Sequence, residues 1–372
     1  MHHPCRSFSL VVAAAAVLLT AGAQIGLAQG NTGAVYVLTN QASNAIMVFH
    51  RDATGALTFA GSFATGGSGA GTGADPLGSQ GSLVLNEDGR LLFAVNAGSN
   101  SVSIFAVSGD QLNLLNTAPS GGVMPVSVTV KHDLVYVLNA GGTPNISGFR
   151  IHPEANQLVA LAGSTRNLPG GAGSAPAQVS FASSTDVIVV TEKNTNRIDT
   201  FEVDEDGSAQ AGVSFPSNGA TPFGFAFDHD SVAIVSDAAG GPGGTSALSS
   251  YEVDESGTLE AITPALGDTQ KAACWVVVPQ SGRFAYTSNT ASGTISSYAI
   301  TDGGHLALFN ALAATPGGAP IDMALSNNSR FLYARNANGT VDGFRVGIGD
   351  GGLTPIGVTS GIPAGAQGIA AR

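Results

Sequence analysis

The sequence predicts an all-β fold, a seven-bladed β-propeller of four-stranded antiparallel blades. Two observations lead to this expectation. A short apolar strand motif recurs seven times at spacings of about 43 to 57 residues, a repeat length typical of propeller blades. The 372-residue chain also contains 51 glycines and only 11% charged residues, a composition that suits many short strands joined by tight turns.

Each repeat contains four strands in a fixed order. In the second repeat these are an apolar first strand, a second strand that ends in Asn, a third strand with an aromatic residue, and a fourth strand after a hairpin: 81–86, 90–96, 101–105 and 111–115. The second strand recurs at 35–38, 91–95, 134–138, 187–190, 232–235, 284–286 and 331–333. The third-strand aromatic recurs as Phe49, Phe105, Phe149, Phe201, Tyr251, Tyr298 and Phe344.

The order of the repeats predicts how the ring closes. The propeller begins at a second strand, 35–38, and ends in what resembles an unpartnered first strand, 367–371. We expect the C-terminal strand to complete the N-terminal blade, because this removes the exposed edges of an open sheet.

Residues 1–28 have the features of a secretory signal peptide. Arg6 precedes the apolar run 8–19, which is too short to span a membrane, and small residues precede possible cleavage points after Ala23 and Ala28. We expect residues 29–372 to form the propeller and to be secreted or periplasmic. An uncleaved N-terminal anchor is the alternative. Cleavage would remove Cys5 and leave Cys274 as the only thiol.

Composition narrows the range of partners. The chain has 14 Lys and Arg residues against 26 Asp and Glu, a net charge of −12, so few cations are available to contact phosphates. We expect no nucleic acid partner, no membrane contact after cleavage of the signal peptide, and a monomer. The expected partner is a small molecule, a lactone or a carbohydrate-like ligand.

Two sets of side chains are expected to converge on the mouth of the channel, where propellers usually bind ligands. The second strands end in Asn40, Asn96, Asn139, Glu192, Asp237, Asn289 and Asn336. The first strands begin near Gln80, Ser127, Gln178, Gly224, Trp275, Asp322 and Gln367. The asparagines are also explained as turn residues that bond to the nearby backbone.

Glu192 and Asp237 replace Asn in two neighbouring repeats, and Lys193 and Arg197 lie beside the first of them. Such a cluster is suited to general acid and base catalysis, with one carboxylate raising the pKa of the other. A structural ion pair explains the same residues. Trp275 either forms an apolar wall for a ligand or orders the mouth by packing.

Other catalytic classes lack the residues that they need at this mouth. The histidines of the predicted propeller fall in turns on the opposite face or in outer hairpins: His50, His132, His152, His229 and His305. A nucleophilic triad then has no base, so we expect Cys274 to be a buried thiol. No cofactor is expected. The oxygen-rich ring leaves Ca²⁺ as an alternative.

The repeats, together with the motifs at 176–181, 189–193, 195–201, 221–227 and 273–278, resemble the seven-bladed lactonase family. This family includes propeller-type 6-phosphogluconolactonases and carboxymuconate lactonizing (cyclase) enzymes. The resemblance covers the chain from about residue 34 to its last residue. It implies a lactone-opening or lactone-forming reaction without a redox cofactor, in which an acid/base carboxylate works beside arginines that hold a carboxylate or phosphate.

By repeat position, Glu192 matches an acidic residue of the family, and Arg197 lies near it. Where family members carry Pro-Arg-His, this chain has Pro176, Ala177 and Gln178, which removes a cation and an imidazole. Two hypotheses follow. In the first, Glu192 or Asp237 is a general base for attack on an uncharged or weakly charged lactone, and Arg197 or Lys193 stabilises the oxyanion. In the second, a non-catalytic propeller binds a small molecule, glycan or protein, with Trp275, Asp322 and Gln178 contributing to binding in either case.

Overall fold

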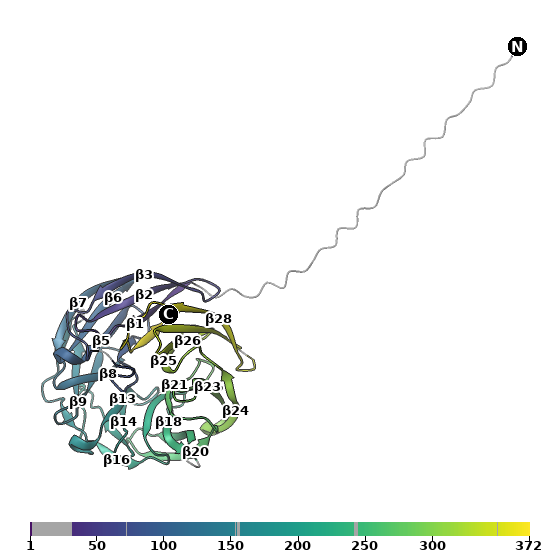
Figure 1. The fold of residues 1–372 in the computed structure, drawn as a ribbon. Helices are drawn as coiled ribbons and strands as arrows, with labels where there is room; N and C mark the ends of the chain where they lie inside the picture. The colour runs from purple at the N-terminus through teal and green to yellow at the C-terminus, as the bar shows by residue number, and fades with distance from the viewer. Residues whose placement is uncertain (2–31, 72, 153, 155–156, 242–244, 348) are drawn as a thin grey trace.

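The computed structural model confirms the seven-bladed propeller (Figure 1). The structure describes residues 1, 32–71, 73–152, 154, 157–241, 245–347 and 349–372. Seven antiparallel sheets follow one another around a ring, and in the described residues the helical segments are three short 3₁₀ turns, Ala97–Ser99, Gly171–Gly173 and Asp302–Gly304. The predicted signal peptide lies almost wholly outside the described residues. No helix in the described part of the chain is long and apolar enough to cross a membrane.

From the channel outward, the strands of the first four blades follow chain order, except that a C-terminal strand comes first in blade 1. Blade 1 contains β29 (Ile369–Ala371), β1 (Gly33–Leu38), β2 (Ala45–Arg51) and β3 (Leu57–Ala64). Blade 2 contains β4 (Leu83–Leu85), β5 (Leu91–Asn96), β6 (Ser101–Ser108) and β7 (Gln111–Pro119). Blade 3 contains β8 (Val123–Lys131), β9 (Leu134–Gly141), β10 (Asn145–Ile151) and β11 (Leu158–Ala160), with β12 (Arg166–Asn167) also paired to β10. Blade 4 contains β13 (Pro176–Phe181), β14 (Val187–Glu192), β15 (Arg197–Glu202) and β16 (Val213–Pro216).

The last three blades follow the same order. Blade 5 contains β17 (Pro222–Phe227), β18 (Val232–Gly241), β19 (Thr245–Val253) and β20 (Leu259–Gly267). Blade 6 contains β21 (Ala273–Val277), β22 (Phe284–Asn289), β23 (Thr294–Thr301) and β24 (His305–Ala314). Blade 7 contains β25 (Pro320–Leu325), β26 (Phe331–Asn336), β27 (Thr340–Val346) and β28 (Leu353–Ser360).

Strand burial explains why the second strands gave the strongest sequence pattern. Every residue of β14 is buried, because neighbouring blades cover both of its faces. The outermost strand β28 has no buried residue. A strand covered on both faces is continuously apolar, whereas a strand that faces water on one side alternates. The core therefore lies between blades, at the level of their inner strands.

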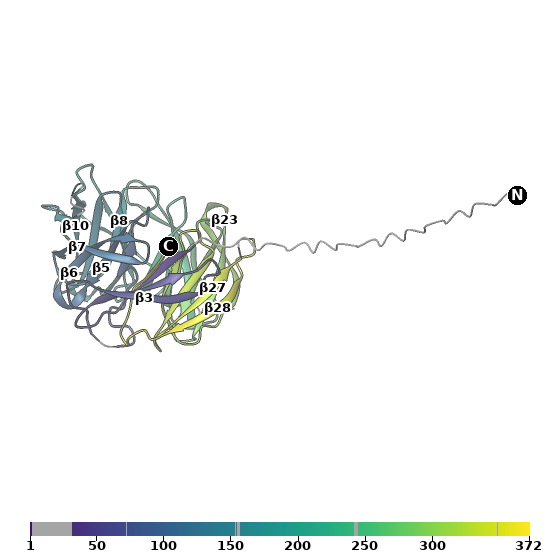
Figure 2. The ribbon, with the colours of Figure 1, turned by 90° about the horizontal axis from the view of Figure 1, so that it is seen from above.

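The predicted ring closure is confirmed. Strand β29 pairs antiparallel with β1, and Val35 lies opposite Ala371, Tyr36 opposite Ala370, and Val37 opposite Ile369. The C-terminal strand thus becomes the innermost strand of the first blade, and the purple and yellow ends of the ring lie side by side in both views (Figures 1 and 2).

A recurring tyrosine bond ties each of several blades to the next. The hydroxyl of a second-strand tyrosine donates to a glycine carbonyl in the outer hairpin of the following blade, from Tyr136 to Gly207 at 2.6 Å and from Tyr286 to Gly351 at 2.8 Å. Blade 4 lacks the tyrosine, and there the Thr200 hydroxyl donates to Gly257 at 2.6 Å. These bonds fix the angle between neighbouring sheets.

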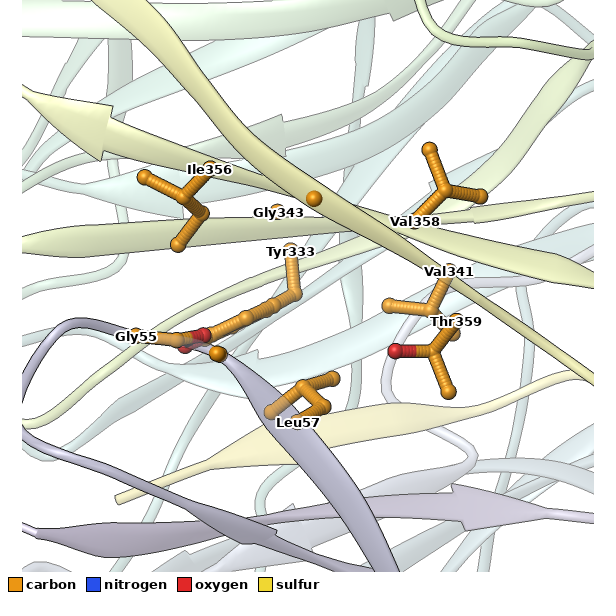
Figure 3. Close-up of a pocket in the computed structure, with 10 residues that line it drawn as sticks. Gly55, Leu57, Tyr333, Val341, Gly343, Ile356, Val358 and Thr359 are labelled. Atoms are coloured by element: carbon orange, nitrogen blue, oxygen red, sulfur yellow. Dashed lines mark hydrogen bonds between the residues drawn. The ribbon is translucent and has the colours of Figure 1, made fainter.

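The seam between blades 7 and 1 has the same bond, from Tyr333 to Gly55. It also contains a cavity of about 100 Å³, lined mainly by apolar groups such as Leu57, Ile356 and Val358 (Figure 3). The Tyr333 hydroxyl is already bonded to Gly55, and the cavity lies at outer strands, away from the channel mouth.

Candidate functional site

Glutamine side chains close the central channel near its mouth. The Gln178 amide accepts a hydrogen bond from the Phe225 N–H at 2.7 Å and donates to the Phe225 carbonyl at 2.9 Å. Gln80 makes the same two bonds with Val276, at 3.0 and 2.8 Å. The inner edge of a first strand has no neighbouring strand, so its buried backbone groups need such partners. Gln178 and Gln80 thus bond to the backbone groups that would otherwise pair with a neighbouring strand.

The segment that carries Gln80 crosses the axis of the ring. It belongs to the connection from β3 to β4, of which we call the described residues 73–82 the mouth loop. The Trp275 indole N–H of blade 6 and the Gln367 amide of blade 1 both donate to the Ser79 carbonyl, each at 3.0 Å. Since Ser79 and Gln80 also reach blades 4, 5 and 6, the mouth loop fills the channel at this level.

Lys193 reaches the mouth as predicted from its repeat position. Its ammonium donates to the Gly78 carbonyl of the mouth loop and stands 5.0 Å from the centre of the Phe223 ring. The Phe223 ring packs on Trp275 with centroids 4.9 Å apart. Burial lowers the pKa of Lys193, and the negative charge of Asp75 opposes this shift. Lys193 is half-buried, and the aromatic pair forms a floor beneath its charge.

Asp75 is a mouth residue that the sequence analysis missed. Its carboxylate accepts a hydrogen bond from the Gly78 N–H at 2.9 Å and interacts electrostatically with Lys193. Although Asp75 as a whole residue is exposed, burial of its carboxylate group raises the pKa of Asp75. The available signal was the length of the mouth loop, because a long connection without strands usually has a function.

Glu192 lies away from solvent in the contact between blades 3 and 4. One carboxylate oxygen accepts from the Gly170 N–H at 3.0 Å and the other from the Thr195 hydroxyl at 2.5 Å. Its neighbour on the next strand is Asp199, a buried carboxyl group that the sequence analysis did not single out. Glu192 directly precedes Lys193, so it fixes the start of the turn that carries Lys193 to the mouth.

Asp237 occupies the corresponding place one blade further on. It is fully buried and accepts hydrogen bonds from the Ser249 hydroxyl at 2.5 Å and the Ser217 hydroxyl at 3.3 Å. Burial raises the pKa of Asp237 to about 7. Glu192 and Asp237 therefore sit in two separate contacts between blades, and each carboxylate is bonded to its own set of neighbours.

Arg197 extends toward the outer part of blade 4. Its guanidinium donates to the Ser214 hydroxyl at 2.6 Å and to the Ser214 carbonyl at 3.1 Å. Ser214 belongs to β16, the outermost strand of the blade. The structure thus brings Lys193 to the mouth and directs Arg197 away from it.

Asp322 and Trp275, two predicted binding residues, are buried in the described structure. Asp322 accepts from the Met323 N–H at 2.8 Å and from the Gly368 N–H at 3.1 Å, which ties blade 7 to the closing strand. Burial raises the pKa of Asp322 well above its usual range. The Cys274 thiol is also buried, which raises its pKa to about 12 and keeps it protonated.

Within the described ranges, no group of three or more His, Cys, Asp and Glu side chains is arranged to hold a metal ion. The groups that the described residues bring together at the mouth include the Lys193 ammonium, the Asp75 carboxylate, backbone groups of the mouth loop and the aromatic floor.

The ring of seven four-stranded blades with polar side chains at a closed channel mouth defines a β-propeller with its site at one end of the axis. The chain belongs to the lactonase family of seven-bladed β-propellers, because the model of that family, "Lactonase, 7-bladed beta-propeller", matches residues 74–366. None of the curated proteins matches the chain in sequence.

Solved structures share the fold at low sequence identity. The periplasmic gluconolactonase PpgL of Pseudomonas aeruginosa is 15% identical with a TM-score of 0.71, over 90% of this chain and 98% of that one. A Lactobacillus plantarum protein is 17% identical with a TM-score of 0.70, over 91% of this chain and 98% of that one. A Bacteroides fragilis protein provisionally assigned as a 6-phosphogluconolactonase is 17% identical with a TM-score of 0.66, over 91% of this chain and 97% of that one.

Proposed function

We propose that the chain hydrolyses a lactone at the channel mouth. The observation that carries this proposal is the placement of the Lys193 ammonium on the mouth loop, over the Phe223 ring and within electrostatic reach of Asp75. Membership of the lactonase family supports the choice of reaction.

In the proposed reaction Asp75 is the general base and Lys193 the electrophile. The Asp75 carboxylate removes a proton from a water molecule as the water oxygen bonds to the lactone carbonyl carbon. The Lys193 ammonium donates a hydrogen bond to the carbonyl oxygen, on which negative charge develops. The ring C–O bond then breaks, Asp75 returns the proton to the leaving oxygen, and a hydroxy acid is released. The raised pKa of Asp75 suits both proton transfers.

Glu192 and Asp237 are the other candidates for the base. Their full burial and their bonds to Gly170, Thr195, Ser217 and Ser249 favour Asp75 over either of them. A role for Glu192 or Asp237 would need these contacts to open so that substrate or water could reach the carboxylate.

The proposed substrate is an uncharged or weakly charged lactone. Lys193 is already bonded to Gly78 and balanced by Asp75, while Arg197 is bonded to Ser214. An anionic group such as a phosphate would need further cations to replace its hydration. We also propose that the protein is secreted or periplasmic, on the basis of the charged and apolar features of residues 1–28.

The test is a panel of neutral and phosphorylated lactones assayed with the wild type, Asp75→Asn, Glu192→Gln and Asp237→Asn. We expect hydrolysis of neutral lactones by the wild type and its loss in Asp75→Asn, with native melting temperature retained. Loss of hydrolysis in Glu192→Gln or Asp237→Asn alone would identify that residue as the general base.

A second candidate function is ligand binding without turnover. The complete hydrogen bonding of Glu192 and Asp237 within the fold favours it. Saturable binding of a lactone or sugar with no hydrolysis by the wild type would establish this function in place of the first.

A further inference from the structure

Six blades bring two buried side chains together in the same register. One lies at or near the end of the second strand, and the other lies two residues after its cross-strand partner on the third strand. The pairs are Asn96 and Ser103, Asn139 and Ser147, Glu192 and Asp199, Asp237 and Ser249, Asn289 and Ser296, and Asn336 and Asp342.

Most of these pairs contain a permanent hydrogen-bond donor. The Asn96 amide donates to Ser103 and the Asn289 amide to Ser296, each at 2.8 Å. In blade 3 both Asn139 and Ser147 donate to the side chain of Asn145. In blades 5 and 7 a carboxylate faces a hydroxyl or an amide: Ser249 donates to Asp237, and Asn336 donates to Asp342, each at 2.5 Å.

Blade 4 departs from this rule, because Glu192 and Asp199 are both carboxyl groups. Neither can donate to the other unless one carries a proton. Both side chains are fully buried. The Ser214 hydroxyl on β16 is a neighbouring donor that lowers the pKa of Asp199, but in the described structure neither Asp199 oxygen forms a hydrogen bond of normal geometry. Two ionised carboxylates at such a site would repel each other without solvent to screen them.

We infer that Glu192 and Asp199 share a single proton, and that this proton-bridged pair positions Lys193 at the channel mouth. Glu192 uses its oxygens to hold the Gly170 N–H and the Thr195 hydroxyl, and the Thr195 bond closes the turn that contains Lys193. If the proton leaves, repulsion between the carboxylates displaces Glu192, and the turn loses its anchor. Glu192 is then a positioning residue that acts through Lys193.

The electrostatics of the site agree with this arrangement. Burial, followed by the neighbouring Glu192, raises the pKa of Asp199 to about 8, while the Ser214 hydroxyl and then the charge of Arg197 lower it. Glu192 on β14 and Arg197 on β15 are the charged groups that act on Asp199. The folded protein therefore retains a proton that the unfolded chain releases near pH 4, so its stability falls as the pH rises from about 4 to about 8.

The first experiment restores a permanent donor on either side of the pair. Glu192→Gln and Asp199→Asn each create an amide facing a carboxylate, the arrangement of Asn336 and Asp342 in blade 7. We expect the melting temperature of the wild type to fall relative to that of each variant as the pH rises from about 4 to about 8. Asp237 is present in all three proteins, so its own titration cancels. Wild type and variants that keep a constant difference at every pH would overturn the shared proton.

A matched control comes from the chain itself. The double variant Glu192→Asn, Asp199→Ser reproduces the pair found in blades 2 and 6. We expect it to fold and to lack the pH-dependent difference. If it keeps the wild-type pH dependence, the proton does not reside on this pair.

The second experiment follows the position of Lys193 through Trp275, the single tryptophan of the chain. Trp275 packs on Phe223, and Phe223 lies under the Lys193 ammonium. We expect a change in Trp275 emission with a midpoint near pH 8 in the wild type, absent in Glu192→Gln and in Lys193→Met. A change that persists in Lys193→Met would overturn the positioning role.

Only the link to turnover rests on the proposed function. Lactone hydrolysis by the wild type should fall as the pH rises above about 8, and Asp199→Asn should lack this alkaline fall. Absence of hydrolysis in every protein, with the stability and fluorescence results as expected, would reject the proposed function and leave this inference intact. An alkaline limit of hydrolysis that is the same in the wild type and in Asp199→Asn would reject the inference alone.

Discussion

The Tyr333 hydroxyl donates a 2.8 Å hydrogen bond to the Gly55 carbonyl, joining two residues that are 278 positions apart in the chain. It supports the ring at the seam where the last blade meets the first. Gly55 has φ of +94°, and a Cβ there would lie within 2.6 Å of the Ile356 and Phe331 side chains. The tyrosine bond and the glycine turn therefore depend on each other.

Tyr333→Phe should lower the free energy of unfolding by about 1 kcal/mol, because the buried Gly55 carbonyl loses its donor. Urea denaturation would measure this. Tyr136→Phe removes the equivalent bond between blades 3 and 4 and should cost a similar amount. A much larger loss in Tyr333→Phe than in Tyr136→Phe would mean that the closing seam has a special role in stability.

Removing residues 363–372 should destabilise the whole molecule. The deletion takes away β29 and exposes the inner edge of β1, and it also removes Gln367 from the mouth loop. A large fall in melting temperature is the expected result. Arg372→Ala keeps both β29 and the Arg372 carbonyl that accepts from Arg51, and it provides the control. An unchanged melting temperature after the deletion would contradict the proposed importance of closure.

Asp237→Asn should make stability less dependent on pH. Because the folded-state pKa of Asp237 is raised from 3.8 to about 7, its favourable contribution is complete at low pH and is lost as the pH rises from about 4 to 7. The loss amounts to at most about 4 kcal/mol. Thermal unfolding at several pH values tests this, with the exposed Asp254→Asn as control. Parallel curves for the wild type and Asp237→Asn would show that Asp237 is ionised in the folded protein.

Lys193→Met should reduce kcat/KM for a lactone substrate by about 100-fold, since it removes the cation that stabilises the developing oxyanion. The chain has three lysines, and the exposed Lys271→Met is a suitable control with no expected effect. Arg197→Met should also leave activity nearly unchanged, because Arg197 is directed toward β16. Equal losses of kcat/KM in Lys193→Met and Arg197→Met would show that Arg197 also acts at the site.

The repeats made the fold predictable, but they placed the site only in part. The second strands and the closing strand could be located because burial on both faces leaves a continuous apolar pattern. Lys193 could be placed at the mouth because it follows a second strand. Arg197 pairs with Glu192 across the sheet, but its long side chain reaches Ser214, a contact that repeat position does not determine.

Other contacts left no signal in the repeat. Asp75 lies in the mouth loop, which has no counterpart at a fixed repeat position, so its approach to Lys193 depends on the path of that loop. Asp199 faces Glu192 only because the register of β14 and β15 brings them together. The role of Gln80 depends on contacts with blades on the far side of the axis.

The glutamines that fill the axis also determine how ligands come and go. With Gln80 and Gln178 bonded to the backbone of blades 5 and 6, the described residues block the axis of the ring at this level. A molecule that enters at Lys193 must therefore leave through the same opening before the next one can enter. Substrate and product use the same opening, so accumulated product should compete directly with substrate.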